Sequence, residues 1–258
     1  MIAALPMYDL PELRPVTDRL WAAIRDAIRA EGIEAPQTLT RDMEDFEAHW
    51  LFPDLLLSQT CGLPFRARLH DRVTLVGTPD YGLSGCKPGY YRSVFVARGE
   101  DARATLSDFE GAVLAYNGAG SQSGWAAPVA HLQAAGLRFR LGPQTGGHRA
   151  SVAAVAGGRA DFAAIDAVTW ALLAGRDPNH ARLRVVGRTE PSPGLPLIAA
   201  AGSDADTLFD AVAAGIAALP PDDRQALHLR GIVRISPQSY LALPLPPNPQ
   251  AFVMGDPA

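Results

Sequence analysis

The stretch NGAGSQSGWAAP, residues 117–128, places small hydroxyl and amide side chains directly before an apolar segment with a helical pattern. The preceding residues, AVLAYN, read as a strand, so this turn lies where the carboxyl end of a strand feeds the start of a helix. Helix starts expose backbone N–H groups that carry a partial positive charge. Ser121, Gln122 and Ser123 add side-chain donors, and the turn is therefore expected to cradle an anion with neutral groups. The alternative is that Ser121 or Ser123 only caps the helix.

Three better-known motifs nearly match this turn, and each fails on a specific residue. A Walker loop needs G-K-[ST], and no lysine lies near. The dinucleotide fingerprint G-x-G-x-x-G, started at Gly118, would need glycine where Ser123 stands. A hydrolase elbow started at Gly120 would place its nucleophile at Gln122. The turn therefore predicts binding rather than phosphoryl transfer, dinucleotide binding or ester hydrolysis.

A second turn of the same kind follows along the chain. Gly147 and His148 stand at the start of the next predicted helix, and Asp166 ends the predicted strand DFAAID. Parallel α/β sheets bind ligands beyond the carboxyl ends of their strands. We therefore expect Gly147, His148 and Asp166 to converge with residues 121–123 at one edge of a sheet, although a lone histidine is more often a capping or surface residue.

The elements that must position these residues follow an α/β pattern. Apolar residues at helical spacing predict a helix over 14–33, and short apolar runs at 54–62, 72–79 and 90–99 predict buried strands. From residue 105 strands alternate with helices, which is typical of a parallel sheet covered on both faces. Residues 204–219 form an amphipathic pattern, whereas the tail 241–258 is too rich in proline for a helix and is expected to be extended.

Composition excludes several classes of function. The chain of 258 residues has a net charge of −4, a single lysine and scattered arginines, so we expect no nucleic-acid partner. No apolar run is long enough to span a membrane, which predicts a soluble protein and not a membrane-embedded one. The N-terminus lacks the basic region of a secretory signal, so we expect a cytoplasmic monomer as the sequence stands, or a periplasmic one if an export signal has been removed.

Cys61 and Cys86 are the only cysteines, and neither has a C-x-x-C or histidine neighbour that would make a metal site. They are either two thiols or one disulfide, and the spacing leaves both alternatives open. Paired carboxylates and a catalytic triad are also missing, so the sequence predicts neither an enzyme nor a cofactor.

Three segments, YYRSVFVAR, SQSGWAAP and TGGHRASVAAVAGGRADFAAID, resemble in their order and spacing the phosphate/phosphonate-type substrate-binding proteins of ABC importers. In that family a hydroxyl-rich turn holds an oxyanion, a G-H turn supplies a histidine, and two aromatic residues line the cleft. The resemblance assigns these roles to Ser121, Gln122, Ser123, His148, Tyr91 and Tyr8. Gln122 stands where the family often has a second hydroxyl. Residues 58–93 depart from the family pattern, and Gln59, Thr60 and Cys61 are expected to reach the cleft.

The resemblance implies an α/β, two-lobed, type 2 periplasmic-binding-protein fold with two crossover hinge strands and a ligand cleft between the lobes. We place the discontinuous lobe 1 at 1–97 plus 192–258 and lobe 2 at 98–191. The implied function is capture of a small oxyanion, such as phosphate, phosphonate or phosphite, in the interlobe cleft for ABC-type transport, with an ABC permease as partner. The alternatives are a cytoplasmic ligand-sensing module, or a small-metabolite enzyme in which Tyr91, His148 and Cys61 would be catalytic.

Overall fold

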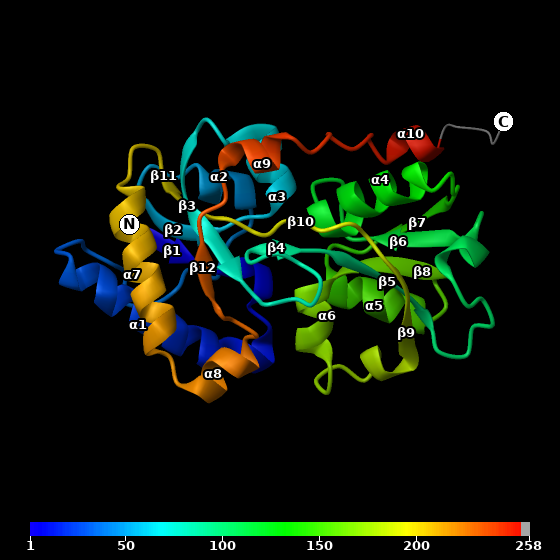
Figure 1. Cartoon of the computed structure of the whole chain (residues 1–258), viewed down its shortest axis with the longest axis horizontal. Coiled ribbons are helices and arrows are strands. Elements are labelled where there is room, and N and C mark those ends of the chain that lie inside the picture. Colours follow the sequence, from blue (N-terminus) through cyan, green and yellow to red (C-terminus); the bar gives the residue numbers. More distant parts are fainter. Residues whose placement is uncertain (254–258) are drawn as a thin grey trace. The chain divides into compact units, whose positions relative to one another are not determined.

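The computed structural model describes residues 1–253, and its chain forms two compact units (Figure 1). Unit 1 comprises Met1–Tyr90 and Pro193–Leu243, and unit 2 comprises Tyr91–Ser192 and the residues from Pro244 on. The chain passes from one unit to the other three times. Two of these passages lie in the strands β4 (Tyr90–Tyr91) and β10 (Ser192–Pro193), which pair with each other. The third passage follows Leu243 and was not expected from the sequence.

Unit 1 is built on a five-stranded sheet of order β1-β2-β11-β3-β12. Only β1 and β2 are parallel, and the other neighbours are antiparallel. The strands are β1 (Ile2–Ala4), β2 (Leu55–Gln59), β3 (Val73–Asp80), β11 (Leu197–Ala200) and β12 (Gly231–Val233).

Two long helices of unit 1, α1 (Arg14–Ala30) and α7 (Ala205–Ala218), pack against each other. The predicted stripe of α1 is buried at Leu20, Ile24 and Ile28, as expected. A Cβ at Gly215 of α7 would lie 2.7 Å from Ile24, so this glycine permits the close approach of the two helices. The shorter helical segments of unit 1 are η1 (Pro6–Tyr8), η2 (Pro11–Leu13), α2 (Phe46–Trp50), α3 (Gly62–Pro64), the π-helix η3 (Phe65–Leu69), α8 (Pro221–Ala226) and α9 (Pro237–Leu241).

Unit 2 has a five-stranded sheet of order β7-β6-β8-β5-β9. The strand β6 is parallel to β7 and β8, and β8 and β9 are both antiparallel to β5, so the strands after residue 105 share one direction as predicted and only the preceding β5 is reversed. The strands are β5 (Ser93–Arg98), β6 (Val113–Tyr116), β7 (Arg140–Gln144), β8 (Phe162–Asp166) and β9 (Leu183–Arg188).

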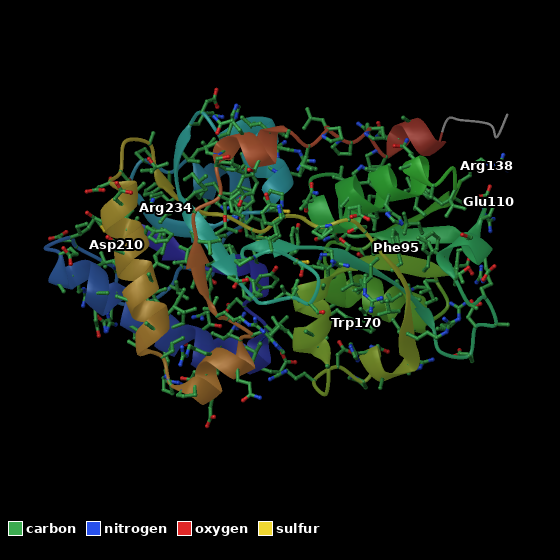
Figure 2. The ribbon with its side chains drawn as sticks, in the orientation of Figure 1. Phe95, Glu110, Arg138, Trp170, Asp210 and Arg234 are labelled. Carbon is green, nitrogen blue, oxygen red and sulfur yellow. The ribbon has the colours of Figure 1, made fainter. Side chains whose placement is uncertain are left out.

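The helices of unit 2 cover this sheet, and Figure 1 shows α4 and α5 on opposite sides of it. Phe95, labelled in Figure 2, belongs to a buried cluster with Leu114, Phe162 and Leu132 of α4. The helical segments are η4 (Leu106–Phe109), the π-helix η5 (Gln122–Ala126), α4 (Ala127–Ala134), α5 (His148–Ala156), α6 (Ala167–Leu173), η6 (His180–Arg182) and α10 (Gln250–Val253).

Two sequence-based assignments need correction at the edges of the units. Residues 91–97 were placed in lobe 1, but β5 is a central strand of the unit 2 sheet. The tail was placed in lobe 1 without a helix, yet it belongs to unit 2 from Pro244 on and contains α10. A hydrogen bond from Trp125 Nε1 to the Pro247 carbonyl, 2.9 Å long, holds this segment on unit 2. A buried indole N–H needs an acceptor, and a proline-rich segment has unused carbonyls to offer.

Candidate functional site

The turn after β6 opens with a serine cap. Ser121 is the N-cap of η5, and its Oγ accepts a hydrogen bond of 2.9 Å from the Gly124 amide. The side chain of Asn117 lies against Gly124, where an added Cβ would come within 1.6 Å of Asn117 Oδ1. A larger residue at position 124 would have to displace the Asn117 side chain. The capping alternative thus holds for Ser121, and Asn117, whose buried Oδ1 has no hydrogen-bond partner among residues 1–253, is a residue of this turn that the sequence reasoning did not select.

Ser123 and His148 meet in unit 2. Ser123 Oγ lies 2.8 Å from His148 Nε2, and the Ser123 carbonyl accepts a hydrogen bond of 2.7 Å from Ser93 Oγ of β5. Ser123 is only 4 % exposed, whereas His148 is half-buried as the first residue of α5. The structure therefore brings together side chains from two successive helix starts, as the order of strands and helices predicted.

His148 is electrically neutral at physiological pH. Burial of the ring lowers its pKa to about 4, and the Ala164 backbone opposes this shift with a smaller effect. A neutral imidazole has one donor and one acceptor nitrogen. The Ser123–His148 pair consequently offers hydrogen bonds without a formal positive charge.

The N-terminus of α5 has no side-chain cap. Gly147 occupies the N-cap position with extended backbone, and nothing lies within 4 Å of where its Cβ would stand. The same open space surrounds Gly146, whose φ of +82° favours glycine. The first amides of α5 thus lie beside an unfilled space, and they resemble an anion-binding helix start in that respect.

Asp166 caps a helix in the structure. It is the N-cap of α6, and its Oδ1 accepts hydrogen bonds of 2.7 Å from the Val168 amide and 3.1 Å from the Thr169 amide. These bonds satisfy amides that would otherwise lack a partner at the helix start. The structure therefore supports a capping role for Asp166 at α6.

Gln122 and Tyr91 are the remaining predicted residues of unit 2. Gln122 is 3 % exposed, and its Nε2 lies 3.5 Å from Ser192 Oγ, a long hydrogen bond. Tyr91, in β4, is also buried. Both residues lie in the protein interior: Tyr91 precedes β5, and Gln122 follows β6 as the first residue of η5.

In unit 1 the structure groups Gln59 and Tyr8 around Tyr81. Gln59 Nε2 donates to Tyr81 Oη at 3.4 Å and to the Leu195 carbonyl at 3.5 Å. The rings of Tyr8 and Tyr81 meet edge to face with centroids 5.0 Å apart. Tyr81 was not predicted. Its position directly after the strand β3 is a signal that could have identified it.

Cys61 is the N-cap of α3 and makes no side-chain cap bond, and the neighbouring Thr60 is fully buried. Cys61 and Cys86 are both thiols in the structure, so of the two alternatives the disulfide is not the one formed. Within residues 1–253 no cluster of His, Cys, Asp and Glu could hold a metal ion. The helices of the same residues include none that is both long and apolar enough to cross a membrane.

A family model for the ABC transporter phosphonate periplasmic substrate-binding proteins matches residues 3–240. The chain belongs to this family. It is therefore a transporter-type substrate-binding protein and not an enzyme, as the resemblance predicted. No curated protein sequence matches the chain.

Solved structures show the same fold at low sequence identity. PhnD1 from Prochlorococcus marinus (MIT 9301), in complex with methylphosphonate, is 16 % identical with a TM-score of 0.70, over 93 % of this chain and 94 % of that one. XAC2383 from Xanthomonas citri, bound to chloride ion, is 17 % identical with a TM-score of 0.67, over 98 % and 95 %. The same protein bound to ATP has a TM-score of 0.64 at 18 % identity, over 98 % and 94 %. These likenesses confirm the predicted type 2 periplasmic-binding-protein fold.

Proposed function

We propose that this substrate-binding protein captures a small phosphonate-like oxyanion, with phosphate and phosphite as related candidates, at the starts of η5 and α5. The observation that carries the proposal is the 2.8 Å contact between Ser123 Oγ and His148 Nε2, beside the uncapped N-terminus of α5. We further propose that the ligand is passed to an ABC permease, that the protein is a monomer, and that it works in the periplasm as the family description states.

The chemistry of the site favours an oxyanion held by neutral donors. Helix-start amides donate hydrogen bonds toward negative charge, and the Ser123 hydroxyl adds a donor in the tautomer whose Nε2–H donates to Ser123 Oγ; each such charge-assisted bond is stronger than a neutral one. Neutral donors avoid the cost of burying a cation when the site is empty. The methylphosphonate complex of PhnD1, which shares the fold, supports this ligand class.

Unit 1 contributes further candidates for ligand selection. We propose this role for Tyr8, Gln59 and Cys61, and we add Tyr81 because Gln59 and Tyr8 both contact it. Their aromatic faces offer apolar contact and the amide offers both a donor and an acceptor, so they would select the organic part of a ligand rather than its anionic group.

Thermal unfolding in the presence of methylphosphonate, phosphate, phosphite and sulfate tests the proposal. A specific ligand stabilises the protein by RT ln(1 + [L]/Kd), about 2.7 kcal/mol at a hundredfold excess over Kd. His148→Ala should remove most of this stabilisation, whereas His70→Ala, which truncates an exposed histidine beside Asp71 in unit 1, should leave it unchanged. The proposal fails if none of the four anions stabilises the wild-type protein, or if His148→Ala retains the full effect.

A further inference from the structure

Unit 1 contains an open cavity of about 490 Å³ between the segment that follows β3 and the region formed by α8 and the residues that join it to β12. This volume lies within the range of small-molecule sites. Its walls combine an aromatic ring and aliphatic side chains, such as Tyr81 and Leu229, with the basic residues Arg224, His228 and Arg230. No aspartate or glutamate of the described residues lines it. The cavity is therefore electropositive and partly apolar.

The position of Arg230 at this cavity is fixed by the fold. Its backbone N–H donates to the Asp80 carbonyl at 2.8 Å, at the end of β3. Its guanidinium lies directly over Gly82, where an added Cβ would be 1.9 Å from Arg230 Nε. Gly82 also has a φ of +59°, so both its conformation and the space above it require glycine. The side chain thus lies on a turn that leaves room for it.

The arginines of this cavity differ from their neighbours in lacking carboxylate partners. Arg19 forms two hydrogen bonds of 2.7 Å with Asp223, and Arg234, labelled in Figure 2, pairs with Asp206 at 2.7 Å. Neither Arg224 nor Arg230 forms an ion pair with any acidic residue in the part of the chain that the structure describes. Their charges are consequently available to an external anion.

His228 supplies an independent sign of strain at the same place. Its φ of +53° is the only positive value at a non-glycine residue among residues 1–253. The backbone there closes α8, with the Leu229 amide bonded to the Arg224 carbonyl at 2.9 Å. Helices usually end in this way at glycine, because other residues are strained in the left-handed region. Strain of this kind is often retained where a side chain has a function, and here it places an imidazole in the cavity wall.

We propose that this cavity is a separate binding site for a small organic dianion, a phosphate monoester or a dicarboxylate with an apolar body. Arg224 and Arg230 neutralise the two charges, since a guanidinium matches the geometry of both phosphate and carboxylate. Tyr81 and Leu229 contact the apolar body. The site uses residues of unit 1 alone and shares only Tyr81 with the residues proposed for ligand selection, so it stands whether or not the oxyanion site at Ser123 and His148 is correct.

The test is an amide NMR titration of the full chain with phenyl phosphate, phthalate and inorganic phosphate. Phenyl phosphate or phthalate should shift the amide resonances of residues 82–84 and 228–230. The probe that binds more tightly shows whether the site prefers a phosphate or a dicarboxylate. Inorganic phosphate should bind more weakly there because it lacks the apolar body. Absence of shifts at these amides with both organic probes overturns the proposal.

Variants separate a built site from general attraction of anions to a basic surface. Arg224→Gln and Arg230→Gln should each weaken binding by about tenfold, the usual effect of losing one charge-assisted hydrogen bond. Arg72→Gln changes the net charge equally at an exposed position away from the cavity and should leave binding unchanged. Equal weakening by all three variants would show non-specific attraction and refute the site.

Two further variants keep the result interpretable. Arg230→Lys retains the charge without the planar fork, and it should bind with an affinity between those of wild type and Arg230→Gln. His148→Ala should leave the binding of phenyl phosphate at residues 82–84 intact. Loss of those shifts in His148→Ala would show that the probe acts through the oxyanion site instead, and would contradict a separate site in unit 1.

Discussion

The two units share a local design, a strand whose carboxyl end leads through polar residues into a π-helical turn. In unit 2, β6 leads through Ser121 to η5, and in unit 1, β2 leads through Thr60 and Cys61 to α3 and η3. Each turn carries a buried glutamine, Gln122 or Gln59, and both are 3 % exposed. π-Helical turns are rare in proteins overall, and those that occur are often found at functional sites.

What differs is the partner of each turn. In unit 2, Ser123 contacts a histidine from the next helix, beside a helix start that no side chain caps. In unit 1, Gln59 contacts Tyr81 and a backbone carbonyl, and the surroundings are aromatic. The same connection from a strand to a π-helical turn therefore presents hydrogen-bond donors suited to an anion in unit 2, and a mainly apolar, aromatic surface in unit 1. Identity of the side chains, rather than the course of the backbone, decides what each turn can bind.

The largest expected effect is on the serine of unit 2. Ser123→Ala removes a donor to the anion and leaves His148 Nε2 without its 2.8 Å partner. Methylphosphonate affinity, measured by calorimetry, should fall by about tenfold to a hundredfold, the range for a hydrogen bond to a charged group. The matched change in unit 1 is Thr60→Val, which preserves shape and removes a hydroxyl whose bond to the Cys61 carbonyl is 3.5 Å long. It should change affinity little, and an equal loss in both variants would remove the distinction between the turns.

The pH dependence of stability should sharpen the contrast, because His148 has no counterpart in the unit 1 turn. Its pKa of about 4 lies below the ordinary value of 6.5, so the unfolded chain binds more protons than the folded one between these pH values. Stability from this group is complete above about pH 6.5 and is lost as pH falls toward 4. We expect a loss of about 2 kcal/mol over this window, after allowing for the partial exposure of the ring.

Chemical denaturation of wild type and His148→Ala at pH 7 and pH 4.5 measures this effect. The variant should show a smaller decrease of the unfolding free energy over the window than the wild type does. His70→Ala, which truncates an exposed histidine beside Asp71, serves as the matched control. Parallel pH curves for wild type and His148→Ala would mean that the ring is not held neutral by the fold.

A smaller effect separates capping from binding within unit 2. Asp166→Ala removes the acceptor of two amides at the start of α6 and should lower the free energy of unfolding by about 1 kcal/mol, the usual cost of losing an N-cap. The stabilisation by methylphosphonate should remain, because the cap bonds already use the carboxylate. If Asp166→Ala leaves the ligand-free stability intact but abolishes ligand stabilisation, Asp166 is a ligand contact, as the sequence had suggested.

The sequence predicted the contact between two helix starts in unit 2 and the common direction of the strands after residue 105, but it did not predict the direction of β5. The pairing of Ser123 with His148 followed from two glycine-containing helix starts in succession, which is a local pattern. The direction of β5 did not follow, because apolar runs look alike in parallel and antiparallel neighbours. The extent of unit 2 also depends on a contact between residues distant in sequence, Trp125 and Pro247, which no local pattern reports.

Tyr81 and Asp166 show the same limit at single residues. Tyr81 matters because it contacts Gln59, 22 positions away in the chain, and only the fold brings the two together. Asp166 was recognised as the end of a strand, but the same position is also the first of a helix, and the structure shows it capping that helix. A polar residue between a strand and a helix fits both roles by sequence alone, and its hydrogen bonds in the structure distinguish them.

The smallest effect concerns the aromatic group of unit 1. Tyr81→Phe removes only a hydroxyl whose hydrogen bond from Gln59 is 3.4 Å long, so stability should change by a few tenths of a kcal/mol at most. The binding of methylphosphonate should be nearly unchanged, whereas the relative affinities for phosphonates with larger organic groups should shift, since Gln59 is then free to reorient. Calorimetric titration with methylphosphonate and phenylphosphonate measures this ratio. A uniform loss of affinity for both ligands would instead make Tyr81 part of the anion site, and the two turns would then share one task rather than divide it.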